Sequence, residues 1–310
     1  MISPRDTKPR ETSPRDRDRL DTNPRDNDFP SSPLDDKPTF QLLCRGETKG
    51  IFQLESGGIR DLLQRMKPDH FRDIIATNAL YRPGPLEGGM VDQYIEVKHG
   101  RKPAEYPHEV TEEILAETHG VMVYQEQVMQ ISQVLAGYTL GGADMLRRAM
   151  GKKKPEEMAK QREIFVTGAT NRGIDPQVSG GIFDLMEKFA GYGFNKSHAA
   201  AYALLSYHTA YLKAHHPAAF MAANMSLAMD DTDKVKILVE DAIDVCKLKM
   251  LPPDINQSDY RFVPVGETGK KATQIRYGMG AVKGSGQNAI ESIVNARREG
   301  GPFTDLFDFC

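Results

Sequence analysis

The spacing of the apolar side chains is the feature that most constrains the fold of this chain. From Pro38 to about residue 250 these side chains recur mostly at intervals of three and four residues, which is the period of one buried helix face. Glycine and proline interrupt the period repeatedly, so it divides into separate helices. The sequence therefore predicts a mainly α-helical domain over residues 38–250.

Several of the expected helices carry residues suited to helix ends. The segment 155–157 opens one helix with a proline and two glutamates, which suit the N-terminal end of a helix dipole. Asp69 is the expected N-cap of a helix over 71–80. The segment 81–85 is expected to break the helical pattern, because two of its residues are prolines. The segment 197–215 is apolar nearly all round, which predicts a helix buried on every side.

The pattern changes after this helical region. The segments 260–265 and 273–277 are short runs, partly β-branched, on either side of a polar turn that contains glycine, which predicts a hairpin. A helical period returns at 286–298. We therefore expect a small α+β module over 251–310, and its apolar C-terminal end without a polar cap suggests a truncated module.

The N-terminal segment differs from the rest in composition. Residues 1–36 contain six prolines and sixteen charged side chains but only five apolar ones, and a unit of the form Ser/Asn-Pro-Arg-Asp recurs at 3–6, 13–16 and 23–26. Such a segment buries too little apolar surface to offset the loss of chain entropy, and it offers no apolar face for stacking. We expect a disordered tail over 1–37. It is either a charged tether, or the translation of a short DNA repeat or of sequence before a misplaced start codon.

The overall composition excludes several classes of protein. The 310 residues include 40 Lys and Arg against 43 Asp and Glu, and the formal net charge of -3 excludes a uniformly basic nucleic-acid coat protein. Three cysteines are too few for a disulfide framework and lack metal-ligand spacing. No run of about 18 apolar residues, as a membrane-spanning helix needs, occurs in the chain, and residues 1–10 lack the apolar stretch of a secretory signal peptide. We expect a cytoplasmic protein without a membrane partner.

A basic stretch in the middle of the chain is the first candidate for phosphate binding. Its five cations lie within eight residues and follow a pair of glycines: Arg147, Arg148, Lys152, Lys153 and Lys154. Arginine presents a planar fork of donors that suits phosphate, and lysine adds point charge. Consecutive helix residues are about 100° apart, so both arginines can lean to one side. The alternative is a set of solvated cations that complement a helix C-terminus.

The second candidate is the segment 189–198. Its two glycines permit a close approach of the backbone, and Tyr192 and Phe194 offer rings on which a base can stack. The polar residues Asn195, Lys196, Ser197 and His198 then begin a helix, where free N–H groups favour an anion. The alternative is a helix-capping loop whose aromatic residues lie in the core.

The third candidate is the glycine-rich segment 280–286, which enters the last expected helix. Lys283, Gly284 and Gly286 lie in it, and its backbone amides suit a phosphate. The segment is similar to the hairpin of a helix-hairpin-helix element, which holds the DNA backbone without reading sequence. The alternative is a plain turn at a helix entry; the spacing of a phosphate-binding P-loop is absent.

The sequence offers no candidate for catalysis or for a metal site. Polymerase-type chemistry needs two or three carboxylates that converge on metal ions. The only Asp-x-Asp after Pro38 is 231–233, and it directly precedes a helix, which favours an N-cap with acidic first-turn residues. The two histidines at 215–216 directly precede a proline, which indicates the end of a helix and not a metal site. We therefore expect no catalytic and no metal-binding residues.

Six segments carry a family resemblance that spans about nine-tenths of the chain. They are 50–56 (GIFQLES), 80–86 (LYRPGPL), 123–129 (VYQEQVM), 141–154, 189–198 and 251–256 (LPPDIN). With them, residues 32–310 resemble the alpha subunits of bacterial DNA polymerase III, the C-family replicative DNA polymerases. The resemblance implies a multi-helix fingers domain followed by the small module with its helix-hairpin-helix-like turn.

The resemblance also implies the function of a DNA-directed DNA polymerase in replication. It implies primer–template DNA, dNTP and other replicative polymerase subunits as partners, and Mg²⁺ as the ion of the complete polymerase, with no cofactor bound by this chain. The residues that it places near the incoming nucleotide are Arg82, Arg147, Arg148, Lys152, Lys153, Asn195, Lys196, Ser197 and His198. Those that it places near DNA are Lys283, Gly284 and Gly286.

The chain departs from the family in what it lacks. Nothing in it stands in the place of the family's palm carboxylates, and the tail of 1–37 has no counterpart. We therefore expect a part of a polymerase that is inactive in isolation. Two alternatives remain open: a stand-alone nucleic-acid-binding module without catalysis, and a structural scaffold whose basic loops only cap helices.

Overall fold

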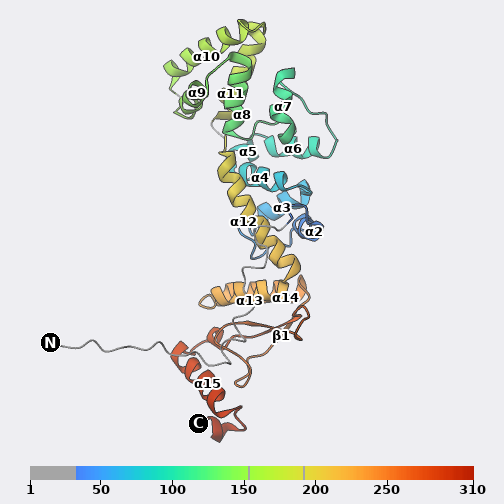
Figure 1. Cartoon of the computed structure of the whole chain (residues 1–310), viewed down its shortest axis with the longest axis vertical. Helices are drawn as coiled ribbons and strands as arrows, with labels where there is room; N and C mark the ends of the chain where they lie inside the picture. The colour runs from blue at the N-terminus through green and yellow to red at the C-terminus, as the bar shows by residue number, and fades with distance from the viewer. Residues whose placement is uncertain (1–32, 153, 191–192) are drawn as a thin grey trace, which may run out of the picture. The chain divides into compact units, whose positions relative to one another are not determined.

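The computed structural model describes residues 33–152, 154–190 and 193–310. The predicted disorder of residues 1–32 lies outside the described residues, as do Lys153, Gly191 and Tyr192. Residues Leu34–Cys310 form one compact unit, which Figure 1 shows coloured along the chain. Asp36 and Lys37, which were expected to end the tail, instead cap and begin the first described helix.

The helices and strands of the described residues are as follows. The α-helices are α2 (Lys37–Cys44), α3 (Gly57–Met66), α4 (Phe71–Leu80), α5 (Pro83–Glu87), α6 (Met90–Lys98), α7 (Glu112–Leu115), α8 (Gln125–Ala136), α9 (Leu140–Lys152), α10 (Pro155–Thr170), α11 (Pro176–Ala190), α12 (Lys196–His215), α13 (Pro217–Leu227), α14 (Thr232–Asp244), α15 (Gln287–Gly300) and α16 (Leu306–Phe309). The 3₁₀ turns are η1 (Glu109–Thr111), η2 (Ala116–Thr118) and η3 (Met279–Ala281), and the strands are β1 (Lys249–Leu251), β2 (Val263–Val265) and β3 (Gln274–Arg276).

The predicted fold class, mainly α with a small α+β module, is confirmed. Three apolar clusters form the core. One joins α2, α3, α4, α12, α13 and α14 with the sheet, a second lies among α7 to α11, and a third joins α3, α4, α6 and the start of α12. The long helix α12, yellow in Figure 1, packs on α2 and α4 and contributes to two of these clusters.

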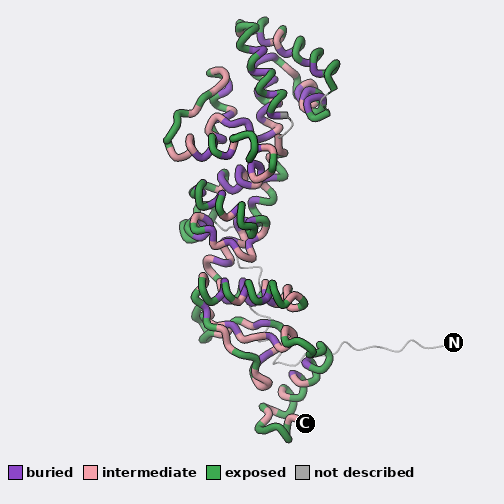
Figure 2. The backbone as a smooth tube through the Cα atoms, turned by 180° about the vertical axis from the view of Figure 1, so that it is seen from behind, coloured by how far each residue is buried: buried purple, intermediate pink, exposed green. Residues whose placement is uncertain are grey.

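The prediction that α12 is buried on every side is wrong. Its fully buried residues, among them Ala199, Ala203 and Ala210, follow a single face, whereas Leu204 and Leu205 are 39% and 46% exposed. Figure 2 shows this mixture of buried and exposed residues along the helices. The apolar side chains on the outer face misled the prediction, because periodicity alone does not show that a helix packs on one side only.

Two predicted helix boundaries also need correction. The residue at the N-cap of α4 is His70 and not Asp69, and Asp73 in the first turn accepts from the backbone N–H groups of both. The segment 81–85 follows the end of α4 at Leu80, as expected, but it is not wholly non-helical, because Pro83 begins the short helix α5. Proline fits there, since the first turn of a helix needs no N–H donor.

The predicted hairpin is confirmed, and it belongs to a three-stranded sheet in the order β1-β3-β2. β2 pairs antiparallel with β3, with Val263 opposite Arg276, and β1 pairs parallel with β3, with Lys249 opposite Gln274. β1 escaped prediction because three residues are too few to show a period. It crosses the expected boundary at residue 250, and the division of the chain into 38–250 and 251–310 stays a prediction.

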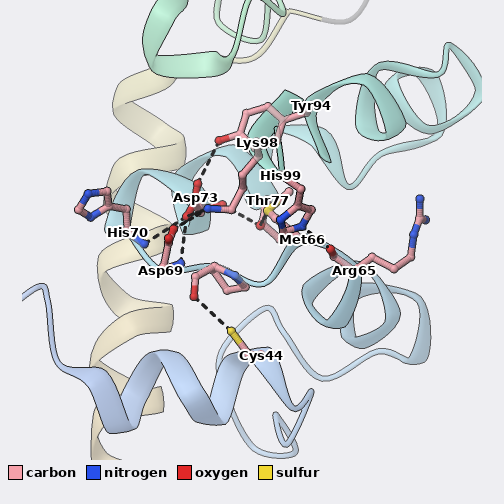
Figure 3. Close-up of polar contacts among 11 residues, drawn as sticks. Cys44, Arg65, Met66, Asp69, His70, Asp73, Thr77, Tyr94, Lys98 and His99 are labelled. Carbon is pink, nitrogen blue, oxygen red and sulfur yellow. Dashed lines mark hydrogen bonds and ion pairs between the residues drawn. The ribbon is translucent and has the colours of Figure 1, made fainter. Parts of the chain in front are cut away.

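A buried carboxylate on α4 ties this helix to α6 and to the turn before α4, as Figure 3 shows. The side chain of Asp73 is fully buried. Its Oδ2 accepts from the backbone N–H of Asp69 and of His70, both at 3.1 Å, and from Nζ of Lys98 at 2.8 Å. The hydroxyl of Tyr94 donates to Oδ1 at 3.2 Å. Four donors on two segments, the turn 69–70 and α6, therefore satisfy one charge, which a buried carboxylate requires.

The stability of this cluster should depend on pH through Asp69. Lys98 donates to Asp69 at 2.5 Å and is the main cause that lowers the pKa of the Asp69 carboxyl to about 2, although desolvation opposes the shift. Because this folded-state pKa lies below the unfolded value of about 3.9, the stabilisation is present above that value and is lost as the pH falls toward 2. We expect the variant Asp69→Asn to be less stable than wild type at neutral pH by no more than ~1 kcal/mol, because the Asp69 side chain is 76% exposed.

Urea unfolding followed by circular dichroism tests this expectation. The difference between the two proteins should shrink steadily from pH 5 to the acid limit of the measurement. A difference that stays constant with pH would show that Asp69 acts through its shape or its neutral hydrogen bonds.

Candidate nucleotide-binding site

The two adjacent arginines of α9 share one acidic partner. Nε and Nη2 of Arg147 donate to Oδ1 of Asp144 at 2.9 and 2.7 Å, and Nε of Arg148 pairs with Oδ2 of Asp144 at 2.8 Å. The hydrogen bond from Arg147 is the main cause that lowers the pKa of Asp144. Both arginines therefore lean to one side of the helix, as their spacing predicted. Asp144 was missed, although residues three and four positions apart on a helix are neighbours.

Gln125, the first residue of α8, joins α9 to the segment after α11. Its Oε1 accepts from Nη1 of Arg147 at 3.2 Å, and its Nε2 donates to the carbonyl of Gly193 at 3.1 Å. Its backbone N–H donates to the carbonyl of Phe194 at 2.9 Å. Gln125 thus fixes the Arg147 guanidinium relative to residues 193–194. Sequence reasoning missed this role, because Gln125 and Gly193 are 68 residues apart.

A pocket of about 240 Å³ lies at this junction. Its lining consists of Gln125, Val128, Arg147, Arg148, Met150, Gly151, Lys152, Phe189 and Gly193. The structure therefore brings together three of the predicted cations with two residues of the second predicted segment, Phe189 and Gly193. Lys153 lies outside the described residues. Gly193 is closely packed, because a Cβ there would be 3.0 Å from Cε1 of Phe189 and 3.1 Å from Cγ of Gln125.

The start of α12 faces carboxylates of the protein itself. Asn195 is the N-cap and accepts from the N–H of His198 at 2.8 Å, while its Nδ2 donates to Glu126 at 2.8 Å. The backbone N–H of Lys196 donates to the same Glu126 at 2.9 Å, and its Nζ pairs with Glu117 at 2.7 Å. Asn195 and Lys196 therefore do not line the pocket with the arginines; they hold α12 against residues that sequence reasoning missed.

Arg82, the residue before α5, also contacts Phe194. Its guanidinium carbon is 4.6 Å from the ring centroid of Phe194, and its Nε donates to the carbonyl of Ala79 at 2.8 Å. Burial lowers the pKa of Arg82. Phe194 is in turn 5.5 Å from the ring of His198, which is exposed, as is Ser197. Phe194 therefore positions two of the predicted residues as well as being a candidate for stacking.

The third predicted segment forms an exposed turn before α15. η3 ends at Ala281, and the Oγ of Ser285 donates to the carbonyls of Met279 and Val282 at 2.8 and 2.6 Å. Gly284 has a φ of +89°, a conformation that favours glycine, and Gly286 is the N-cap of α15. Lys283, Gly284 and Gly286 are all exposed. Their N–H groups and the lysine thus lie on the surface of the turn.

The described residues offer no metal centre of their own. Across 33–152, 154–190 and 193–310, no group of three or more histidine, cysteine or acidic side chains is placed to hold a metal ion. Asp231, part of the Asp-x-Asp, instead accepts from the N–H of Lys234 at 3.1 Å as the N-cap of α14, as predicted. Within the same residues, no helix is both long and apolar enough to cross a membrane.

The sequence matches two family models. Residues 17–173 match the model described as the bacterial DNA polymerase III alpha subunit finger domain, and residues 247–310 match the model of the helix-hairpin-helix motif. The first match covers half of the chain. The chain belongs to the family of the bacterial DNA polymerase III alpha subunit finger domain, as the resemblance of its motifs indicated.

Relatives from three bacteria are similar over most of the chain. Each is a DNA polymerase III subunit alpha. The protein of Pseudomonas aeruginosa is 57% identical over 283 residues (90% of this chain), that of Escherichia coli 57% over 288 (91%), and that of Vibrio cholerae 58% over 286 (90%). The matched region is 24% of the length of each relative. The chain thus spans about a quarter of these proteins.

Proposed function

We propose that this chain is the part of a replicative DNA polymerase that holds the triphosphate of an incoming deoxynucleotide. Arg147, Arg148 and Lys152 are the proposed phosphate ligands. The observation that carries the proposal is their convergence on one pocket, whose walls Gln125 links to residues 193–194. Membership of the polymerase family supports the same conclusion.

The chemistry of the pocket suits a polyanion. Arginine forks bind phosphate oxygens through charge-assisted hydrogen bonds, each worth ~1.5–3 kcal/mol. Because Gln125 and Asp144 already orient the Arg147 guanidinium, little ordering remains to be done when a ligand binds. Asp144 also offsets part of the positive charge, so we expect modest affinity that falls with salt.

The other predicted residues have supporting places in this proposal. Asn195, Lys196 and Arg82 hold the start of α12 and Phe194 in position. Ser197 and His198 are exposed but do not line the pocket, so their contact with the nucleotide is proposed from the family alone. Lys153 is proposed from its sequence position alone, between Lys152 and the start of α10.

The first test concerns the arginines. Arg147→Ala and Arg148→Ala should each weaken binding of a fluorescent dNTP analogue by about tenfold at low salt, because each removes a donor fork that the remaining residues do not replace. Fluorescence anisotropy measures the Kd. The matched control is Arg162→Ala, since Arg162 on α10 also pairs with an aspartate, Asp184 at 3.1 Å, but does not line the pocket.

The Arg162→Ala control should bind the analogue like wild type. If both pocket variants bound the analogue with wild-type affinity, Arg147 and Arg148 would not be phosphate ligands. They would then act only as cations that complement the C-terminal end of the helix.

Asp144 provides a second test with the opposite sign. Asp144→Asn keeps an oxygen that accepts from Arg147 but removes the negative charge beside the phosphate ligands. We expect the Kd for the analogue to fall about two- to fivefold at low salt and the gain to shrink at high salt. Weaker binding in this variant would mean that the charge of Asp144 matters chiefly for holding the arginines in place.

A second function is proposed for the C-terminal module. The exposed turn at Lys283, Gly284 and Gly286 and the helix-hairpin-helix match support contact with the backbone of primer–template DNA. Such contact is independent of the nucleotide pocket. Association with other replicative polymerase subunits is proposed from the family alone.

Catalysis by the chain alone is not expected. Nucleotidyl transfer relies on metal ions bridged by carboxylates, and the described residues contain no group of three or more His, Cys or acidic side chains placed to hold a metal ion. The purified chain should therefore show no template-dependent extension of a primer with Mg²⁺ and dNTPs above the background of a blank preparation. Incorporation that the Arg147→Ala variant loses would contradict this, whereas incorporation that persists in the variant would indicate a contaminating polymerase.

A further inference from the structure

A second pocket shares one wall with the nucleotide pocket. It has a volume of about 380 Å³, and residues of α6 and α11, both labelled in Figure 1, line it together with the segments 105–107 and 120–122. Among the described residues that line the two pockets, only Phe189 on α11 is common to both. The other residues that line the second pocket have no part in the nucleotide site.

The second pocket has an apolar floor and an open rim. Its most buried apolar side chains are Val121, Met122 and Phe189, which are 4, 9 and 6% exposed. Leu185, which is 50% exposed, adds an apolar side chain to the rim. A concave site with a buried apolar floor is the usual form of a small-molecule site, whereas a protein partner covers a broader surface.

The backbone at Gly120 shapes one wall of this pocket. Gly120 has a φ of +82°, which favours glycine, and a Cβ there would lie 2.6 Å from the carbonyl oxygen of Glu105. The segment 120–122 therefore approaches the segment 105–107 more closely than any other residue at position 120 would allow. The pocket is thus formed by the course of the backbone before a ligand binds, as is usual for small-molecule sites.

The charges around the second pocket disfavour a nucleotide. Its described lining contains one carboxylate, Glu105, and one ammonium group, Lys188, whereas three cations line the nucleotide pocket. One balanced pair of charges does not match a triphosphate. Gln93 and the hydroxyl of Tyr106 add hydrogen-bonding groups to an otherwise mainly apolar lining. This chemistry suits a mainly apolar molecule without net charge that carries a hydrogen-bond donor at its edge.

We infer that the second pocket binds a flat, mainly apolar small molecule without net charge, and that its occupancy strengthens nucleotide binding. The coupling, which rests on the proposed function, runs through the ring of Phe189. This ring packs closely on Gly193, where a Cβ would be 3.0 Å from Cε1 of Phe189, and Gln125 joins Gly193 to Arg147. A ligand that fixes the ring leaves less to be ordered when the nucleotide binds.

The experiment titrates the full chain with 5-fluoroindole, a flat, uncharged molecule with one N–H donor, and follows binding by fluorine NMR. Leu185→Glu places a charge at the apolar rim and should weaken binding about tenfold or more. The matched control is Val178→Glu, because Val178 is 42% exposed on the same helix but lines neither pocket. This control should bind the probe within about twofold of wild type.

The chemical class of the ligand is tested by competition. Deoxyadenosine should not displace 5-fluoroindole, because the polar edge of its base would find no partners on the apolar floor. Displacement by deoxyadenosine at similar concentrations would contradict the assignment of a mainly apolar ligand. Circular dichroism of the two variants should show the helix content of wild type, since both substitutions are at exposed positions.

A third measurement tests the coupling. A saturating concentration of 5-fluoroindole should lower the Kd of the fluorescent dNTP analogue about two- to threefold in wild type and in Val178→Glu, but not in Leu185→Glu. The inference is overturned if wild type does not bind the probe, if Leu185→Glu binds it as tightly as wild type does, or if the probe leaves the Kd of the analogue unchanged or raises it. Failure of wild type to bind the analogue without the probe overturns the proposed function instead, and the probe titration alone then decides whether the second pocket is a site.

Discussion

The buried carboxylate of Asp73 is the interaction on which the arrangement around the site depends. A charge without access to water must be matched by donors, and Asp73 finds them on the turn before α4, on Tyr94 and on Lys98. It thereby fixes α6 and the turn at the start of α4, and α4 is a principal packing partner of α12. α12 in turn begins with its N-cap Asn195 and with Lys196, which contact Glu126 and Glu117. Loss of the Asp73 contacts would therefore reach the site through the packing.

Acidic side chains are as much a part of the basic site as its cations. Asp144 orients both arginines, and Glu126 and Glu117 hold the start of α12. Such pairs reduce the free positive charge, but they also hold donors in fixed directions before a ligand arrives. A site of this kind suits a ligand that must bind, be discriminated and leave again.

Much of the helical fold follows from local signals. The start of α10 at Pro155 and the N-cap of α14 at Asp231 agree with prediction, because these signals act within a few residues. Asp69 was misassigned and the short helix that begins at Pro83 was missed for the same reason: an acidic residue and a proline each suit more than one position near a helix start. Local sequence patterns could not show that α12 is buried on one side only.

The sequence by itself determined the helical class, the positions of most helices and the identity of the cations, because periodicity, capping and charge belong to short stretches of chain. It also determined the family, through ordered motifs. Only the tertiary structure decided that Gln125 would meet Arg147 and Gly193, that Glu126 would contact the start of α12, and that the ring of Phe52 would contact that of Tyr202. These contacts join residues from 22 to more than 100 positions apart. They form only when the apolar faces of separate helices are buried together, which no local pattern encodes.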